Sequence, residues 1–241
     1  MELLRQSTLK NALLNSLRAG LGILALPAFG QVVLTGELLT NPDAETGNLT
    51  GWTVVSGTGN TTPSADNGTY DTGYNPHAGS YDFVGDHFPG GGGAQGYLRQ
   101  NVDVSSLPGA TTAQTDAGTV AAQVTFWELS YNQGSSSDYA NIGLSFKNAS
   151  AVTLQTVATS TVMSIDVWKQ TQVTFTLPAG TRSIDYLMQF YRASNGGTYI
   201  DSFIDDNSLK LISVPEPATL TIATTVGLLV FALGRRKCEP A

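Results

Sequence analysis

The chain is poor in the residues that build common catalytic and redox sites. Its 241 residues include one cysteine and two histidines. The cysteine, Cys238, lies close to the C-terminus beyond a long apolar run, so the central segment has no disulfide. The sequence contains no His-Glu-x-x-His, no Cys/His metal spacing and no Gly-x-Ser-x-Gly. The glycines at 90–93 are not followed by Gly-Lys-Ser/Thr, which argues against a phosphate-binding loop. We therefore expect a protein that is not an enzyme.

Charge is also scarce, and most of it has one sign. Only 13% of the residues are charged. Between Gln31 and Val214 there are six basic and sixteen acidic residues, a net charge of about −10. Nucleic-acid binding needs a basic surface, so the composition excludes it. An acidic surface is compatible with cation binding or with a neutral sugar ligand.

The N-terminal segment has the layout of a secretory signal peptide. Arg5, Lys10 and Arg18 precede a short apolar stretch at residues 19–29. Ala28 and Gly30 supply small residues before a cleavage site at Gln31. We predict that residues 1–30 are a signal peptide and that the protein is exported.

The C-terminal segment combines three features in a fixed order. Pro215, Glu216 and Pro217 form a Pro-Glu-Pro triplet, and residues 218–234 contain no charge. Arg235, Arg236 and Lys237 follow directly. Seventeen residues span roughly 25 Å as a helix, enough to cross a thin bilayer core. The basic cluster predicts a cytoplasmic C-terminus, with the rest of the chain outside.

This tail, residues 214–241, resembles the PEP-CTERM sorting signal. The resemblance implies export in a Gram-negative bacterium that makes exopolysaccharide. It also implies recognition by an exosortase-type membrane enzyme that removes the tail. On this reading the inner membrane holds the chain briefly through helix 218–234, and the protein then reaches the cell surface or extracellular matrix.

Between the two ends, residues 31–213 alternate between apolar and polar with a period of two. Residues 120–129 place Val120, Val124 and Phe126 on one face, and 142–146 and 184–190 repeat the pattern. Glycine, asparagine, serine and proline clusters separate these runs. No long helical stripe is present. The pattern predicts one all-β sandwich of short strands.

The order of several short motifs resembles galactose-binding-like jelly rolls, a fold shared by many carbohydrate-binding modules. The motifs are LLTNPDAETG at 38–47, LTGW at 49–52, GSYDF at 79–83, YLRQNV at 97–102, TFW at 125–127, WKQ at 168–170 and FIDDNSL at 203–209. The resemblance implies a jelly-roll β-sandwich. Ala44 stands where such domains carry phenylalanine, and we expect Leu38 or Leu39 to fill that space.

The same resemblance implies a structural calcium ion that joins the opening and closing segments of the domain. The matching oxygen donors are Asn41, Asp43, Glu45 and Asp206, with Asp205 as a neighbour. The alternative is ordinary turn chemistry, because asparagine and aspartate are common at turns.

Residues 70–87 combine aromatic rings with hydrogen-bonding groups, as sugar binding requires. The candidate ligand-binding residues are Tyr70, Tyr74, His77, Asp82, Asp86 and His87. Tyr131, Tyr139 and Tyr191 are candidates for a second rim. The alternative is that the aromatic residues pack against strands, which we expect for Tyr81, Trp127, Trp168 and Trp52.

These observations favour an exported, non-catalytic protein that binds or scaffolds exopolysaccharide. Two alternatives stay open. Asp82 and Asp86 are a carboxylate pair that a surface glycosidase or lyase could use. A purely structural matrix protein would need no ligand.

Overall fold

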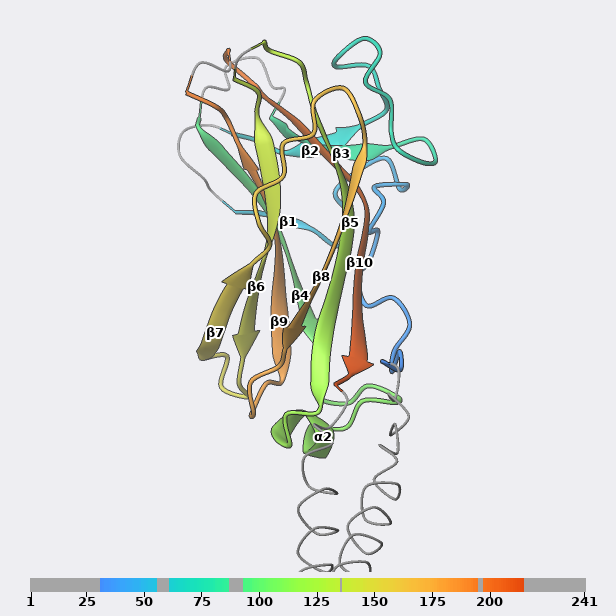
Figure 1. Ribbon diagram of the computed structural model, residues 1–241, viewed down its shortest axis with the longest axis vertical. Coiled ribbons are helices and arrows are strands. Elements are labelled where there is room, and N and C mark those ends of the chain that lie inside the picture. Colours follow the sequence, from blue (N-terminus) through green and yellow to red (C-terminus); the bar gives the residue numbers. More distant parts are fainter. Residues whose placement is uncertain (1–30, 56–60, 87–92, 135, 195–196, 215–241) are drawn as a thin grey trace, which may run out of the picture. The chain divides into compact units, whose positions relative to one another are not determined.

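The computed structural model describes residues 31–55, 61–86, 93–134, 136–194 and 197–214 (Figure 1). Within these residues the chain is nearly all β, as the alternating pattern predicted. In chain order the elements are β1 (Thr53–Val55), β2 (Ser64–Asp66), β3 (Asp82–Asp86), β4 (Gln95–Asp103), α2 (Thr112–Asp116), β5 (Val120–Ser130), β6 (Tyr139–Lys147), β7 (Thr153–Ala158), β8 (Lys169–Thr176), β9 (Ser183–Tyr191) and β10 (Ile200–Ser213).

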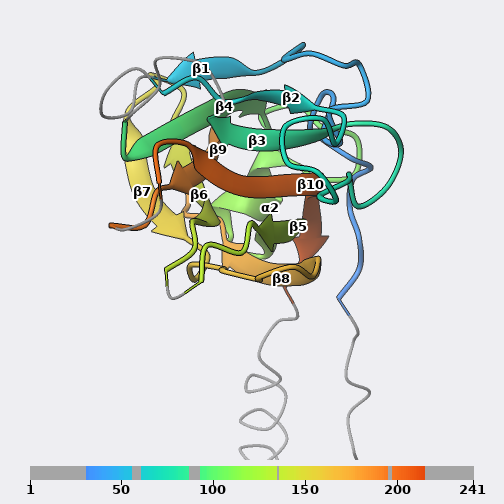
Figure 2. The same cartoon turned by 90° about the horizontal axis from the view of Figure 1, so that it is seen from above.

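The strands form two five-stranded antiparallel sheets. One sheet has the order β1-β4-β9-β6-β7 and the other β2-β3-β10-β5-β8. Figure 2 shows the two layers from above, and contacts of β10 with β9 and of β3 with β4 join them. The predicted β-sandwich is therefore confirmed.

The main core fills the space between the two sheets. Phe126, Phe146, Tyr186 and Phe190 have relative exposures of 0%, in line with their inward position in the alternating pattern. The side-chain oxygen of Tyr186 has a hydrogen-bond partner, because its hydroxyl donates to Asn207 Oδ1 at 2.9 Å. Burial of these apolar side chains thus stabilises a domain whose sequence has no cysteine for a disulfide.

Residues 38–52 close one side of this core. Ala44 is fully buried and has a left-handed φ of 58°, a backbone conformation that is unfavourable for any residue with a side chain. A larger side chain at this position would also be crowded by the surrounding core. Leu39 belongs to the core and Leu38 packs against it. Trp52 belongs to the core as well, and its indole Nε1 donates to Asn41 O at 2.9 Å.

A second, smaller apolar cluster lies on the outer face of the β2-β3-β10-β5-β8 sheet. Val84, Leu129 and Phe203 form its buried part. The segment 67–81 passes over this face, with Tyr74 stacked on Phe203 at a centroid distance of 6.1 Å and His77 stacked on Trp127 at 3.8 Å. We call this segment the covering loop. It positions the candidate site described below.

The predicted signal peptide (1–30) and the Pro-Glu-Pro tail with helix 218–234 lie outside the described residues, and both stay predictions. In the part of the chain that is described, no helix has the length and apolar character needed to span a bilayer.

Candidate functional site

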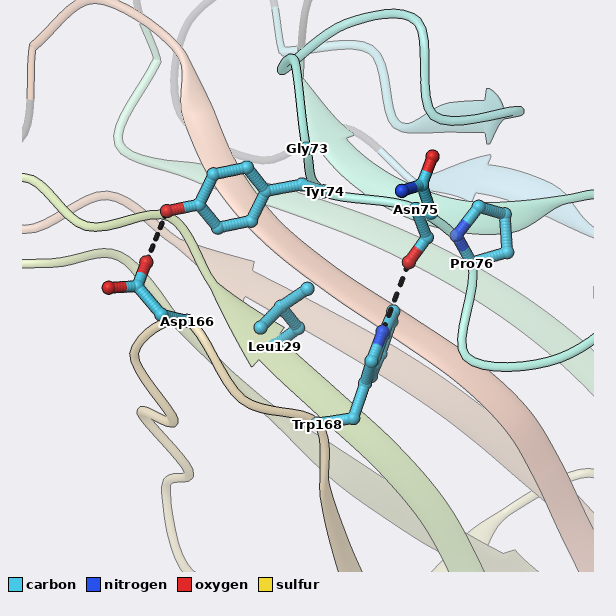
Figure 3. Close-up of a pocket in the computed structure, with 7 residues that line it drawn as sticks. All are labelled: Gly73, Tyr74, Asn75, Pro76, Leu129, Asp166 and Trp168. Atoms are coloured by element: carbon cyan, nitrogen blue, oxygen red, sulfur yellow. Dashed lines mark hydrogen bonds between the residues drawn. The ribbon is translucent and has the colours of Figure 1, made fainter.

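A cavity of about 440 Å³ opens between the covering loop and the segment that leads into β8. Figure 3 shows Tyr74 and Trp168 on opposite sides of it, with Leu129 between them. Gly73, Asn75, Pro76 and Asp166 complete the lining. Two aromatic walls around a small cavity suit a flat, partly apolar ligand.

Hydrogen bonds fix the Tyr74 wall. Its hydroxyl donates to Asp166 Oδ1 and accepts from Asn132 N, the latter at 3.1 Å. Asn132 Nδ2 donates to Asp166 Oδ2 at 2.7 Å, which closes the network. Burial and the bond to Asp166 raise the pKa of Tyr74, and the bonds from Tyr74 and Asn132 lower the pKa of Asp166. Tyr74 therefore stays neutral and Asp166 ionised around pH 7.

The Trp168 wall is fixed in a similar way from the covering loop. Its indole Nε1 donates to Asn75 O at 3.0 Å, the bond drawn in Figure 3. This bond uses the edge of the ring. Both walls are therefore held by their polar atoms, while their apolar rings line the cavity.

The other aromatic and histidine candidates of the covering loop do not line the cavity themselves. His77 stacks on Trp127 and lies edge-on to Trp168 at a centroid distance of 5.8 Å, and its Nδ1 lies 2.6 Å from Asp206 Oδ2. Tyr70 is 37% exposed, and its hydroxyl accepts from Ser64 Oγ at 3.5 Å. His87 lies outside the described residues.

Asp82 and Asp86 are both fully buried on β3, with relative exposures of 0%. They are four residues apart on one strand, a rise of roughly 13 Å. Glycoside hydrolysis needs two carboxyl groups about 5–9.5 Å apart that can reach a sugar. Burial and spacing both argue against this pair in that role.

The four residues predicted to hold calcium make other contacts. Asn41 bonds to Asn48 O and Thr46 N across its turn, and Asp43 Oδ1 accepts from Glu45 N. Glu45 Oε1 accepts from Ser80 N at 2.7 Å and from Tyr81 N at 2.8 Å, so it ties the opening segment to the start of β3. Asp206 faces His77. The calcium site on these four residues stays a prediction.

The three tyrosines predicted as one rim divide between the two sheets. Tyr131 packs against Tyr74, with a centroid distance of 4.7 Å. Tyr139 and Tyr191 stack at 5.1 Å on the outer side of the other sheet, where Tyr97 joins them at 6.2 Å from Tyr191. Burial raises the pKa of Tyr191 to about 12. We call Tyr97, Tyr139 and Tyr191 the tyrosine face.

Sequence reasoning named Tyr74 but missed five other residues of the cavity lining and placed a sixth in another role. Asp166, Leu129 and the three loop residues Gly73, Asn75 and Pro76 were not among the candidates, and Trp168 was expected only to pack. Trp127 and Tyr81 do pack, against His77 and the main core respectively. The useful signal was Asp166, since aspartate is common in turns and a ring that follows a turn can leave the sheet.

No protein-family model and no curated protein matches the chain. Among solved structures, it is similar to the enzymatically active domain of tailspike protein 4 of bacteriophage CBA120, with a TM-score of 0.51 and 12% identity. That match covers 73% of this chain and 21% of the tailspike chain, so it spans about a fifth of that protein.

Two carbohydrate-binding modules are similar over nearly their whole length. A family 61 module solved with β-1,4-galactotriose has a TM-score of 0.46 and 18% identity, covering 73% of this chain and 98% of the module. A family 16 module has a TM-score of 0.45 and 17% identity, covering 71% and 98%. At such identities a structural likeness concerns the fold alone.

Proposed function

We propose that the domain binds a polysaccharide without transforming it, and that the cavity between Tyr74 and Trp168 holds one of its sugar rings. The observation that carries this proposal is the pair of aromatic walls held in place by their polar edges. A sugar ring has two faces of C–H groups and a rim of hydroxyls. It therefore suits a site that offers aromatic faces and polar groups together.

Preorganisation is the physical advantage of this arrangement. Binding costs free energy whenever a side chain must be ordered, about 0.5–1.5 kcal/mol for each flexible side chain. Here Asn132, Asp166 and Asn75 O fix the rings before a ligand arrives. Leu129 gives the cavity an apolar floor, so burial of sugar C–H groups adds a favourable term.

Asp166 supplies the charged group of the cavity that can recognise a sugar hydroxyl. Its pKa is lowered, so it remains a charged acceptor for a sugar hydroxyl across the neutral range. With a net charge of about −10 from Gln31 to Val214, the domain should favour neutral glycans over polyanions.

The test is affinity gel electrophoresis of the full-length chain with a panel of soluble neutral and acidic polysaccharides. We expect retardation by at least one neutral glycan. Trp168→Ala should abolish it, whereas Trp168→Phe, which keeps an aromatic wall, should retain part of it. Thermal melting of each variant shows whether the fold is kept.

Tyr191→Ala is the matched control, because it removes a ring of similar size from the tyrosine face. If this variant alone loses binding, the glycan site belongs on the tyrosine face. If no polysaccharide, including that of the producing bacterium, retards the wild type, the binding function is refuted and a structural matrix role takes its place. Release of reducing ends from any panel member would instead indicate a glycosidase, and unsaturated products a lyase.

We further propose that the protein is exported and sorted through its tail, with an exosortase-type enzyme as processing partner and the cell surface or matrix as its destination. The support is the order of Pro215–Pro217, the uncharged run and Arg235–Lys237. Intact-mass analysis of matrix and membrane fractions tests it. A matrix species that begins near Gln31 and ends near Pro217 is expected. Retention of residues 218–241 in every fraction would contradict processing.

A further inference from the structure

Asp166 brings a negative charge to the cavity between Tyr74 and Trp168, and no protein cation balances it in the described part of the chain. Its carboxylate accepts from the Tyr74 hydroxyl and from Asn132 Nδ2, and both of these donors are neutral. The two bonds lower the pKa of Asp166, so the group is ionised at pH 7. Among the described residues, the lysine and arginine ion pairs are made with other aspartates. The charge of this exposed side chain is therefore available to a ligand.

The backbone holds this carboxylate at the end of β5. Asp166 has a left-handed φ of 60°, and its N–H donates to Ser130 O at 3.2 Å. Outside glycine this conformation is uncommon, and asparagine and aspartate adopt it most readily. Ser164 Oγ donates to Val167 O at 2.6 Å within the same turn. The charged group is thus positioned before a ligand arrives, as the two rings are.

Two aromatic faces border the cavity that Asp166 lines (Figure 3). The faces of tryptophan and tyrosine rings carry partial negative charge and attract a cation within about 6 Å of the ring centre. Tyr74 and Trp168 use their polar edges in bonds to Asp166 and Asn75 O, which leaves their faces for the ligand. Two such faces beside an ionised carboxylate favour a positively charged group over a neutral hydroxyl.

We propose that this cavity selects amino sugars, with the protonated amino group beside Asp166 and the ring C–H groups against Tyr74 and Trp168. The inference rests on the glycan binding proposed above and specifies its substrate class. An ammonium group donates up to three hydrogen bonds, and a bond to an ionised carboxylate is stronger than one between neutral groups. The net charge of about −10 from Gln31 to Val214 acts in the same direction, because it attracts a polycation.

The basic residue next to the cavity, Lys169, does not reverse this preference. It follows Trp168 as the first residue of β8 and pairs in register with Glu128. Its charge lowers the pKa of Glu128, whereas the groups that shift the pKa of Asp166 include no basic residue. Asp166 is the charged residue of the described cavity lining, so a ligand there meets a negative charge.

The test compares three tetrasaccharides with the same β-1,4 backbone, built from glucosamine, glucose or N-acetylglucosamine. They differ at one position of each ring, which carries an amino group, a hydroxyl or an acetamide. Titration calorimetry of the full-length chain at about pH 5.5 measures their affinities, because the amino groups are then protonated and Asp166 stays ionised. We expect the glucosamine tetramer to bind roughly tenfold more tightly than the other two. Added NaCl should narrow this difference.

Asp166→Asn removes the charge and keeps the shape of the side chain. Asparagine also tolerates the left-handed φ, so the thermal midpoint should stay close to that of the wild type. The affinity for the glucosamine tetramer should fall roughly tenfold, while that for the glucose tetramer should change by less than about threefold. Asp103→Asn is the matched control, because it makes the same change in net charge at an exposed position on β4 of the other sheet. It should keep the preference for the amino sugar.

The inference is overturned if the wild type binds the glucosamine tetramer no more tightly than the glucose tetramer, or does not bind it. Retardation by neutral polysaccharides in the gel assay would then still support the proposed function, so the two failures can be told apart. An unchanged preference in Asp166→Asn would place amino-sugar recognition elsewhere. An equal loss in Asp103→Asn would attribute the preference to overall charge, which also contradicts the inference.

Discussion

Glu128 should make the domain less stable as the pH rises, and replacing it with glutamine should remove that loss. The residue is fully buried at the inner face of β5, opposite Lys169 of β8. Its carboxylate accepts from Ser130 Oγ at 2.6 Å and from Ser164 N at 2.9 Å. Burial nevertheless dominates and raises the pKa of Glu128 from 4.5 to about 7.

The direction of this pH effect on stability follows from how many protons the folded and unfolded chains bind. Between pH 4.5 and about 7 the folded chain keeps the proton of Glu128, while the unfolded chain has lost it. Stability therefore falls as the pH rises through this window. A difference of one pKa unit between the folded and unfolded states corresponds to about 1.4 kcal/mol, so Glu128 should lower the free energy of unfolding by about 3 kcal/mol once the pH exceeds 7. Burial also raises the pKa of Asp201 and Asp205 to about 7. The free energy of unfolding should therefore fall further in the same pH range because of these two residues.

Urea unfolding of the full-length chain, followed by tryptophan fluorescence between pH 4.5 and 8, measures the effect. Glu128→Gln keeps the shape of the side chain, and Ser130 can turn its hydroxyl to accept from the new amide. Near pH 4.5 the two proteins should differ little. At pH 8 the variant should be more stable by about 2–3 kcal/mol. A difference in unfolding free energy that stays constant from pH 4.5 to pH 8 would refute the reasoning. Asp103→Asn, outside any buried site, controls for a general charge effect.

Two further substitutions test the packing between the sheets and a carboxyl group whose pKa is lowered rather than raised. Gly85→Ala should destabilise the fold by about 1–3 kcal/mol in urea unfolding. The reason is that a Cβ atom there would lie 2.6 Å from a side-chain carbon of Ile200 and 2.7 Å from Phe190 Cβ. Gly36→Ala has no atom within 4 Å and should be neutral. Asp185→Asn should destabilise the fold at pH 7 and by less at pH 3. Burial opposes ionisation of Asp185, yet Lys147 and its other partners lower its pKa below 3.8, so the stabilisation by this carboxylate declines as the pH falls below that value. Equal effects at both pH values would contradict this.

The strands of the sandwich could be predicted because a half-buried strand repeats every two residues. The runs beginning at Val120, Ile142 and Ile184 fall in β5, β6 and β9, and their apolar positions point into the main core. The position of Trp52 in the core was predicted as well. Local patterning was sufficient for these elements because each one buries its apolar face against the opposite sheet.

The cavity could not be derived from such patterning. Period-two alternation assigns Trp127 and Leu129 to the face opposite Phe126, but it does not say whether that face meets solvent or another segment. In the structure the covering loop passes over it, and only this tertiary contact turns Leu129 into the floor of a cavity. Trp168 and Asp166 come from a segment more than ninety positions after Tyr74 in the chain, a separation that no local motif encodes.

The covering loop accounts for both the successes and the failures among the candidate residues. Its aromatic and acidic content suggested a ligand-binding segment, yet its residues act in two different ways. Tyr74 turns toward the cavity, while His77 covers Trp127 and faces Asp206. Asp82, on β3 directly after the loop, is fully buried, which excludes direct contact with a glycan. Residues that composition grouped as one sugar site are thus divided by burial into a cavity wall, a cover and a buried carboxyl group.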